Sequence, residues 1–423
     1  MKITIEDVTI CDERSPWHLK NANVILENGV ISYVGSENRT VGTKLDGKGK
    51  WLTPGWFDMW ANFCDPGYEQ KEDLTTGSSA AMSGGFTGVA LLPNTDPVTQ
   101  TKNNLKYIST GNNDRITRLF PLAAVTMGAT GTDITEMIDL FENGAAGFTN
   151  GENPVMSSGL LMKTLQYLQK FDGLLLQRPA DADLSKFGMI NEGAMSVTLG
   201  MPGMPSIAEE LIIKRDLDLL EYAGGRIHFS LLSTAGSVDI IRKARQSGLQ
   251  VSCSMAAYQP LLTEDEMKSF DTNLKVNPPL RTVTDNDALV EGLKDGTITV
   301  IVTAHNPQDT ESKALEFDLA EFGMIGLQTA GPNLAALSEK VPMEVLLRAV
   351  TLGPREELRI DVPAIDEGSP VDVTLLDPNK KWTFDEKTNF SKSENSAYFG
   401  QELTGCVELT ARGKMFWHNP LFT

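Results

Sequence analysis

Imidazole and thiolate groups, the side chains best suited to binding zinc, are few and widely spaced in this chain. Its four histidines are His18, His228, His305 and His418. Its four cysteines, which form no C-x-x-C pair, are Cys11, Cys64, Cys253 and Cys406. Because two of the histidines lie near the chain ends, only two imidazoles remain for the central region. A metal site that needs several imidazoles cannot be assembled from these residues, and the cysteine spacing indicates neither a disulfide framework nor a zinc knuckle.

Structural or solvated roles are the favoured interpretation for the remaining candidates. His228 lies in an apolar run and is expected to be a hydrogen-bonded core histidine, and a structural role is also favoured for His305. Glu152 and Asp181 could bind a cation through oxygen, but solvated loop carboxylates are far commoner. The run Lys71-Glu72-Asp73 is predicted to be a solvated loop.

Composition excludes several classes of partner. The 423 residues carry a formal net charge of −19, whereas nucleic acids and anionic membranes require a basic surface. No apolar run approaches the roughly 20 residues that span a bilayer. The first residues alternate like a strand and show no signal-peptide core. We therefore expect a cytoplasmic protein with reduced thiols and with neither nucleic acid nor membrane as partner.

The elements that must position any site follow a strand-then-helix pattern. Between residues 51 and 359, short apolar runs such as Ile298 to Thr303 alternate with amphipathic segments such as Ile207 to Ala223. This alternation over some 300 residues favours a (β/α)8 barrel of the TIM type. Residues 1–50 and 360–423 read as short antiparallel strands, so we expect both termini to build one small β-sandwich-like subdomain.

One segment carries a family signature. Residues 54–67 read Pro-Gly-Trp-Phe-Asp-Met-Trp-Ala-Asn-Phe-Cys-Asp-Pro-Gly, which resembles the Pro-Gly-x-x-Asp-x-His-x-His-x-Arg-x-Pro-Gly motif of dihydroorotases and other cyclic amidohydrolases. Further strings follow in the order of that family: Gly84 to Val89, Leu92 to Pro97, Ile190 to Gly193, Val276 to Arg281, Gly326 to Thr329 and Glu367 to Val373. The resemblance covers nearly the whole chain and implies the barrel of the amidohydrolase superfamily.

The resemblance also implies a catalytic chemistry, but this chain has different residues at the positions that carry it out in the family. In that family zinc activates a hydroxide that attacks a cyclic amide, and an aspartate moves the proton. The positions of the metal ligands and of that aspartate are occupied by Trp60, Asn62, Asn150, Arg178, Leu231 and Ala304. Indole and carboxamide nitrogens do not replace imidazole on zinc, and a guanidinium repels a divalent metal. We therefore expect no catalytic residue, no bound metal and no cofactor, with the family's zinc absent.

A substrate-like pocket is nevertheless expected from Asn94, Asn277, His305 and Arg178. The two asparagines match substrate-contacting asparagines of the family, although turn stabilisation accounts for them equally well. Cys64 replaces a substrate-binding arginine, and Gln308 replaces a substrate-contacting histidine.

Two main classes of function remain open, with a third interpretation beside them. The favoured one is a dihydroorotase-like protein of pyrimidine biosynthesis that is catalytically inactive, forms a homo-oligomer and assists assembly of aspartate transcarbamoylase, as such homologues do in some bacteria. The alternative is a divergent active cyclic amidohydrolase with altered or no metal. A third interpretation is a ligand-sensing barrel, in which Arg178 and Asn94 bind an anion.

Overall fold

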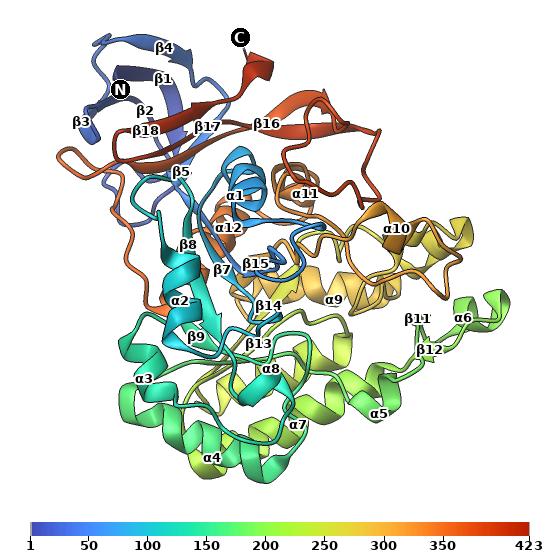
Figure 1. Cartoon of the computed structure of the whole chain (residues 1–423). Helices are drawn as coiled ribbons and strands as arrows, with labels where there is room; N and C mark the ends of the chain where they lie inside the picture. The colour runs from blue at the N-terminus through green and yellow to red at the C-terminus, as the bar shows by residue number, and fades with distance from the viewer. Residues whose placement is uncertain (1, 423) are drawn as a thin grey trace.

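Eight parallel strands form a nearly closed barrel at the centre of the computed structural model, which describes residues 2–422 (Figure 1). Around the barrel the strand order is β15-β14-β13-β10-β9-β8-β7-β6. The strands are β6 (Trp56–Ala61), β7 (Phe86–Leu91), β8 (Arg118–Ala123), β9 (Gly147–Phe148), β10 (Leu175–Gln177), β13 (Ile227–Phe229), β14 (Val251–Ala256) and β15 (Val300–Val302). The first and last strands meet through Asn62, whose backbone N–H donates to the carbonyl of His305 at 2.9 Å.

Helices surround the barrel and bury its outer face (Figure 1). They are α1 (Leu74–Ser83), α2 (Lys102–Ser109), α3 (Met137–Glu142), α4 (Ser158–Leu168), α7 (Ser206–Ala223), α8 (Ala235–Gln246), α9 (Val283–Lys294), α10 (Thr310–Lys313), α11 (Ala330–Leu337), α12 (Met343–Val350) and α13 (Leu352–Leu358). Short 3-10 turns are η1 (Met127–Ala129), η2 (Gln169–Phe171), η3 (Glu264–Ser269), η4 (Thr272–Leu274) and η5 (Pro420–Phe422). Because the strands are covered on both faces, nearly all of their residues are buried, and runs such as Val300-Ile301-Val302 are continuously apolar.

Strands from both ends of the chain form a second sheet beside the barrel (Figure 1). Its order is β18-β17-β16-β5-β1-β2-β3, with β4 paired to β1. The strands are β1 (Lys2–Ile10), β2 (Asn21–Glu27), β3 (Val30–Gly35), β4 (Thr43–Asp46), β5 (Trp51–Pro54), β16 (Asp372–Thr383), β17 (Glu402–Arg412) and β18 (Met415–His418). The predicted fold class, a TIM-type barrel with a β-subdomain built from both termini, is confirmed. We propose residues 51–359 as the barrel domain and 1–50 with 360–423 as the subdomain, although β5 pairs within the terminal sheet.

Two excursions leave these layers. An arm made of α5 (Ala182–Ser185), β11 (Ile190–Asn191), α6 (Ala194–Leu199) and β12 (Gly203–Met204) projects from the barrel (Figure 1). The connection between β16 and β17, residues 384–401, returns to the barrel. We call it the strap. Within residues 2–422, no helix is long and apolar enough to cross a membrane.

Candidate functional site

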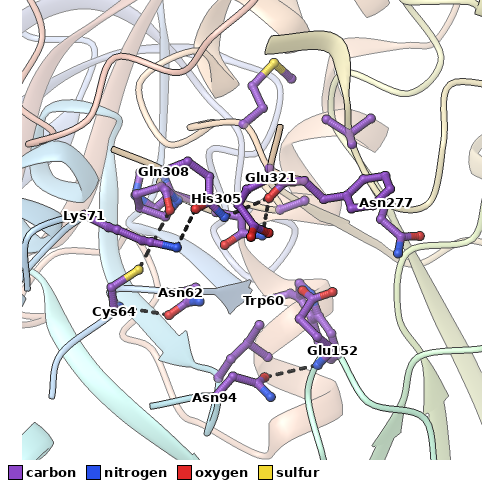
Figure 2. A pocket seen from close by; sticks show the side chains of 18 of the residues that line it. Trp60, Asn62, Cys64, Lys71, Asn94, Glu152, Asn277, His305, Gln308 and Glu321 are labelled. Carbon is purple, nitrogen blue, oxygen red and sulfur yellow. Dashed lines mark hydrogen bonds between the residues drawn. The ribbon is translucent and has the colours of Figure 1, made fainter. Parts of the chain in front are cut away.

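A cavity of about 370 Å³ opens at the end of the barrel where the strands finish (Figure 2). Active sites of TIM-type barrels are built at this end, from the loops that follow the strands. The lining residues from those strand ends include Trp60, Asn62, Asn94, Arg178, Leu231, Tyr258, Ala304 and His305. The barrel strands therefore bring together side chains that are far apart in the sequence.

Most of the residues predicted for this site line the cavity, but Asn150 does not. Its side chain lies behind the wall, 2% exposed, where Oδ1 accepts from the Thr126 N–H at 3.1 Å and Nδ2 donates to Thr126 Oγ1 at 2.9 Å. Its backbone carbonyl accepts from Asn94 Nδ2 at 3.1 Å. Asn150 thus holds the loop after β9 and makes no contact with the cavity.

Arg178 occupies the wall at the end of β10 and is only 5% exposed. Its Nη1 donates to the carboxylate of Glu152 at 3.0 Å and to the Glu152 carbonyl at 3.2 Å. This ion pair fixes a guanidinium where the family places a metal-binding imidazole. Because Arg178 is buried, whereas the Glu152 side chain is 33% exposed, removing Glu152 would leave a buried guanidinium without a counter-charge.

The two predicted asparagines differ in their bonding. Asn94 Oδ1 accepts from the Glu152 N–H at 3.1 Å, so Asn94 stabilises the loop after β9 as well as lining the cavity (Figure 2). Asn277 lines the opposite wall, and its side chain makes no hydrogen bond to any residue in the range 2–422. Its donors and acceptor are therefore free to face a ligand.

The resemblance places paired aspartates at Asn150 and Gly151, and Gly151 stands at the second of these positions. Its φ is +61°, and a Cβ added to it would lie 1.7 Å from Asn94 Oδ1. No side chain fits at this position unless Asn94 moves. The loop after β9 packs against Asn94, so a carboxylate does not fit at this position.

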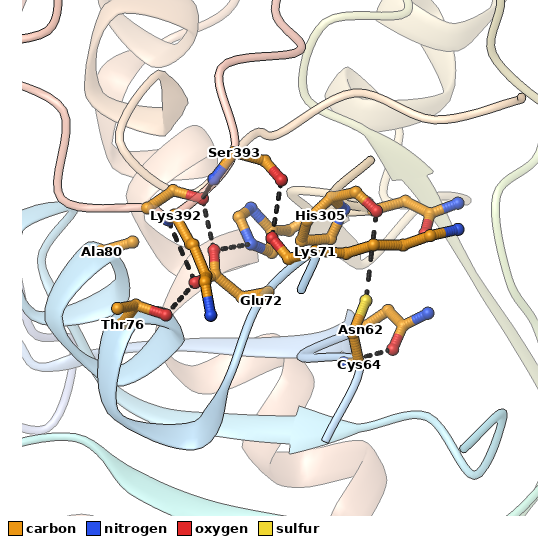
Figure 3. A network of polar contacts seen from close by, with 12 residues as sticks. Asn62, Cys64, Lys71, Glu72, Thr76, Ala80, His305, Lys392 and Ser393 are labelled. Atoms are coloured by element: carbon orange, nitrogen blue, oxygen red, sulfur yellow. Dashed lines mark hydrogen bonds and ion pairs between the residues drawn. The ribbon is translucent and has the colours of Figure 1, made fainter. Parts of the chain in front are cut away.

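The prediction that Lys71-Glu72-Asp73 forms a solvated loop is wrong. Glu72 is fully buried and accepts from the side chains of Thr76 and Ser391 and from the Lys392 N–H at 3.1 Å (Figure 3). Asp73 caps α1 through two backbone N–H groups, and Lys71 reaches the cavity, where Nζ donates to Gln308 Oε1 at 2.6 Å. The strap supplies two of the hydrogen-bond partners of Glu72. Because the strap is remote in sequence, no local sequence pattern predicts these contacts.

The two central histidines both have structural roles. His228 is completely buried, with Nδ1 2.9 Å from Ser252 Oγ, which confirms the predicted core histidine. Burial, with a smaller contribution from the charge of Arg226, lowers the pKa of His228 to about 3. His305 lines the cavity, but its Nδ1 accepts from the Gly326 N–H at 3.2 Å and its Nε2 lies 3.5 Å from Glu72 Oε2.

Asp58 is a fully buried carboxyl on β6, the strand that also carries Trp60. Burial raises its pKa to about 7, although hydrogen bonds from Thr303 and from the Trp60 N–H oppose the shift. Its carboxyl joins β6 to β15 across the barrel seam. Asp58 is therefore a group that positions the two strands.

The backbone at three strand ends is unusual. Cys64, Leu231 and Ala304 have φ values of +60°, +61° and +51°. Residues with a side chain rarely adopt this left-handed conformation, which costs about 1–2 kcal/mol each. All three are positions where the resemblance expects a functional side chain.

The residues of this mouth do not fit the zinc site that the resemblance implies. Indole, carboxamide, guanidinium and alkyl groups stand at the ligand positions, and both ring nitrogens of His305 face other protein groups. Across residues 2–422, no group of three or more histidine, cysteine, aspartate or glutamate side chains could hold a metal ion. The donor set of this mouth therefore does not match a zinc centre that would activate a hydroxide.

Comparison with known proteins gives one family. A model of the Dihydro-orotase-like family matches residues 49–237. The dihydroorotase of Pelotomaculum thermopropionicum is 37% identical over 98% of this chain and 97% of its own length. The dihydroorotase of Acetivibrio thermocellus is 37% identical over 92% of each chain.

Solved structures agree on the fold. The L-hydantoinase of Arthrobacter aurescens superposes with a TM-score of 0.85 at 20% identity, covering 98% of this chain and 95% of that one. The dihydropyrimidinase of Brevibacillus agri gives 0.81 at 18% identity with the same coverage. At such identities the likeness concerns the fold alone.

These comparisons correct one expectation from the sequence, namely that no cofactor is to be associated with this protein. The relatives that match over nearly their whole length are named dihydroorotase, and dihydroorotases are zinc-dependent. The prediction of no cofactor was wrong because it treated altered ligand positions as sufficient to remove a property of the whole family. With 37% identity across almost its entire length, the chain belongs to the dihydroorotase family.

Proposed function

We propose that this protein is a non-catalytic member of the dihydroorotase family that serves as an assembly partner of aspartate transcarbamoylase. The observation that supports the first part is the ion pair of the buried Arg178 with the partly exposed Glu152, which places a cation at a ligand position. A second observation supports it. Ala304 stands at the position of the proton-transferring aspartate and has no group that could donate or accept a proton.

The second part of the proposal concerns what the fold does without that chemistry. The barrel strands remain mostly apolar and buried, and hydrogen bonds join both the terminal sheet and the strap to the barrel. An assembly partner needs a rigid surface and nothing from its pocket, which agrees with this pattern. We further propose a homo-oligomer in the cytoplasm, in keeping with four unpaired, buried cysteines.

The test of assembly is co-expression with the transcarbamoylase of the same organism. We expect the two proteins to co-purify and to elute together, ahead of either one alone. A transcarbamoylase that is fully assembled and active alone, and that elutes independently at micromolar concentration, would refute the assembly role.

A divergent active cyclic amidohydrolase is the second candidate, and the names of the relatives favour it. Dihydroorotate ring opening and closure, measured with and without added Zn²⁺, separates the two candidates. Turnover that follows the protein through purification and disappears in an Arg178→Ala variant would establish the second candidate.

A further inference from the structure

Another cavity, of about 360 Å³, lies at the end of the barrel where the strands begin, opposite the mouth described above. Leu174, Ile227 and Val251 line it, and these residues stand just before or at the start of β10, β13 and β14. Its volume falls in the range of small-molecule sites, which is roughly 300–1,000 Å³. TIM-type barrels carry their chemistry at the other end, so a ligand in this cavity would not be the substrate of the mouth.

Arg245, from α8, brings a guanidinium to this cavity without a carboxylate partner among residues 2–422. Its Nη1 donates to the carbonyls of Gly296 and Thr297, the second at 2.8 Å, and no partner is found in that range for its Nε and Nη2. Arg242, one turn earlier on the same helix, is by contrast paired with Asp295 at 2.7 Å. Arg245 therefore keeps a charge without a direct ion pair, together with donors that are free for a ligand.

A second guanidinium reaches the same cavity from the residue before β13. The side chain of Arg226 is 17% exposed, and its Nη2 donates to the Glu357 carbonyl at 2.8 Å while Nη1 donates to the Asp172 carbonyl at 3.4 Å. Backbone carbonyls thus hold both guanidinium groups in place. A ligand that binds them meets side chains that are already ordered, which lowers the entropic cost of binding.

Two carboxylates also line the cavity, and each has partners of its own. Glu356 accepts two hydrogen bonds from Arg348, both at 2.9 Å. Glu357 Oε2 accepts from Ser252 Oγ at 2.7 Å and lies 4.0 Å from Arg226 Nη2. Burial raises the pKa of Glu357, although the Ser252 hydrogen bond and the nearby guanidinium groups oppose the shift. Each carboxylate therefore has an arginine beside it, and the guanidinium that is not engaged in this way is the one from α8.

The donors of this cavity match a phosphate group. Guanidinium groups bind phosphate through paired N–H donors, and a phosphate has enough oxygens to accept from two of them at once. Leu174 and Leu249 add apolar wall beside the two arginines. We propose that this cavity binds the phosphate group of a small molecule, held between Arg226 and Arg245. The proposal goes beyond the proposed function, because binding here requires neither turnover nor a partner protein.

Isothermal titration of the purified full-length protein tests the proposal, with inorganic phosphate and glycerol 3-phosphate as probes at constant ionic strength. We expect a phosphate probe to bind in one equivalent and acetate to bind at least about tenfold more weakly, because acetate carries a single charge and fewer acceptor oxygens. Tighter binding of glycerol 3-phosphate than of inorganic phosphate would support a phosphate monoester as the ligand. Equal binding of the two would support free phosphate.

Variants locate the site. Arg245→Gln should weaken phosphate binding at least about tenfold, and Arg245→Lys should weaken it less, because lysine keeps the charge but not the planar fork. Gln250 lines the cavity, and its side chain makes no hydrogen bond within residues 2–422. Gln250→Glu should therefore weaken phosphate binding by repulsion without removing a contact. Arg242→Gln is the matched control, and its phosphate affinity should equal that of wild type.

Thermal melts of every variant verify folding. The proposal fails if neither phosphate probe binds at millimolar concentration, or if acetate binds as tightly as phosphate. It also fails if Arg245→Gln and Gln250→Glu both bind phosphate with wild-type affinity. Because every substitution lies away from the mouth and no transcarbamoylase is present, these outcomes are independent of the turnover and assembly experiments.

Discussion

Glu72 and His305 meet in a buried space between the barrel and the strap, with His305 Nε2 at 3.5 Å from Glu72 Oε2 (Figure 3). Because His305 Nδ1 accepts a hydrogen bond from Gly326, the neutral ring must carry its proton on Nε2, which points at the carboxylate. The same carboxylate accepts from Ser391 and Lys392 of the strap. Glu72 therefore connects the cavity wall to the β-subdomain.

Replacing Glu72 by glutamine should destabilise the protein by about 1–3 kcal/mol, because an amide nitrogen would then face donors that need an acceptor. Hydrogen exchange should accelerate in the strap, around Ser391 and Lys392, more than in the barrel strands. Glu69→Gln is the control, since Glu69 is exposed in the same loop. Unchanged exchange in the strap would show that Glu72 does not hold it.

Gly151→Asp should destabilise the protein by about 2 kcal/mol or more. The new Cβ would overlap Asn94 Oδ1, and the residue would have to keep a left-handed backbone. Urea unfolding measures the change. Gly159→Asp provides the comparison, because a Cβ there meets nothing within 4 Å. Equal stability of the two variants would contradict the close approach to Asn94.

Ala304→Asp should leave dihydroorotate turnover at the background rate, with or without added Zn²⁺. One restored carboxylate cannot act alone when Trp60, Asn62, Arg178 and Leu231 still occupy the ligand positions. Spectrophotometric assay of the wild type and the variant at equal concentration provides the measurement. A rate that rises with the single change would show that the other groups already support the reaction.

Stability should fall in mild acid because of His228. Its pKa of about 3 in the folded protein lies below the value near 6.5 expected in the unfolded chain, so between these values the unfolded state binds the extra proton. The free energy of unfolding should therefore decrease as the pH falls below about 6.5, by up to about 1.4 kcal/mol per pH unit. A His228→Gln variant should lose less stability than wild type between pH 7 and pH 4. Parallel curves for the two proteins would contradict this account.

The fold could be predicted from the sequence for two reasons. The hydrophobic patterns of strands and helices are local, and the strings shared with the dihydroorotase family occur in the same order along the chain. Strand-then-helix alternation indicates a barrel, and both ends read as β-structure, but the predicted boundary at residue 51 assigned β5 to the barrel, whereas it pairs with β1 and β16. Residues at strand ends, such as Trp60 and Arg178, could be assigned to the cavity because parallel strands all finish at the same end.

Other features of the site could not be predicted in this way. Glu72 has the sequence surroundings of a solvated loop, and only the strap, which is remote in sequence, buries it. Asn150 follows β9 in the expected place, yet its side chain turns toward Thr126 rather than the cavity. Lys71 was predicted to be solvated for the same reason as Glu72. The contacts that fix the conformation of the loop after β6 come from residues that are remote in sequence.

The left-handed backbone at Cys64, Leu231 and Ala304 has a consequence for how this protein could be altered. Glycine adopts that conformation without steric penalty, so Ala304→Gly relieves local strain, whereas most other replacements preserve it. Leu231 is bulkier and keeps the same conformation, so the main chain still directs a side chain into the mouth at that point. New functional groups introduced at these three positions would therefore take the orientations that the barrel backbone already imposes.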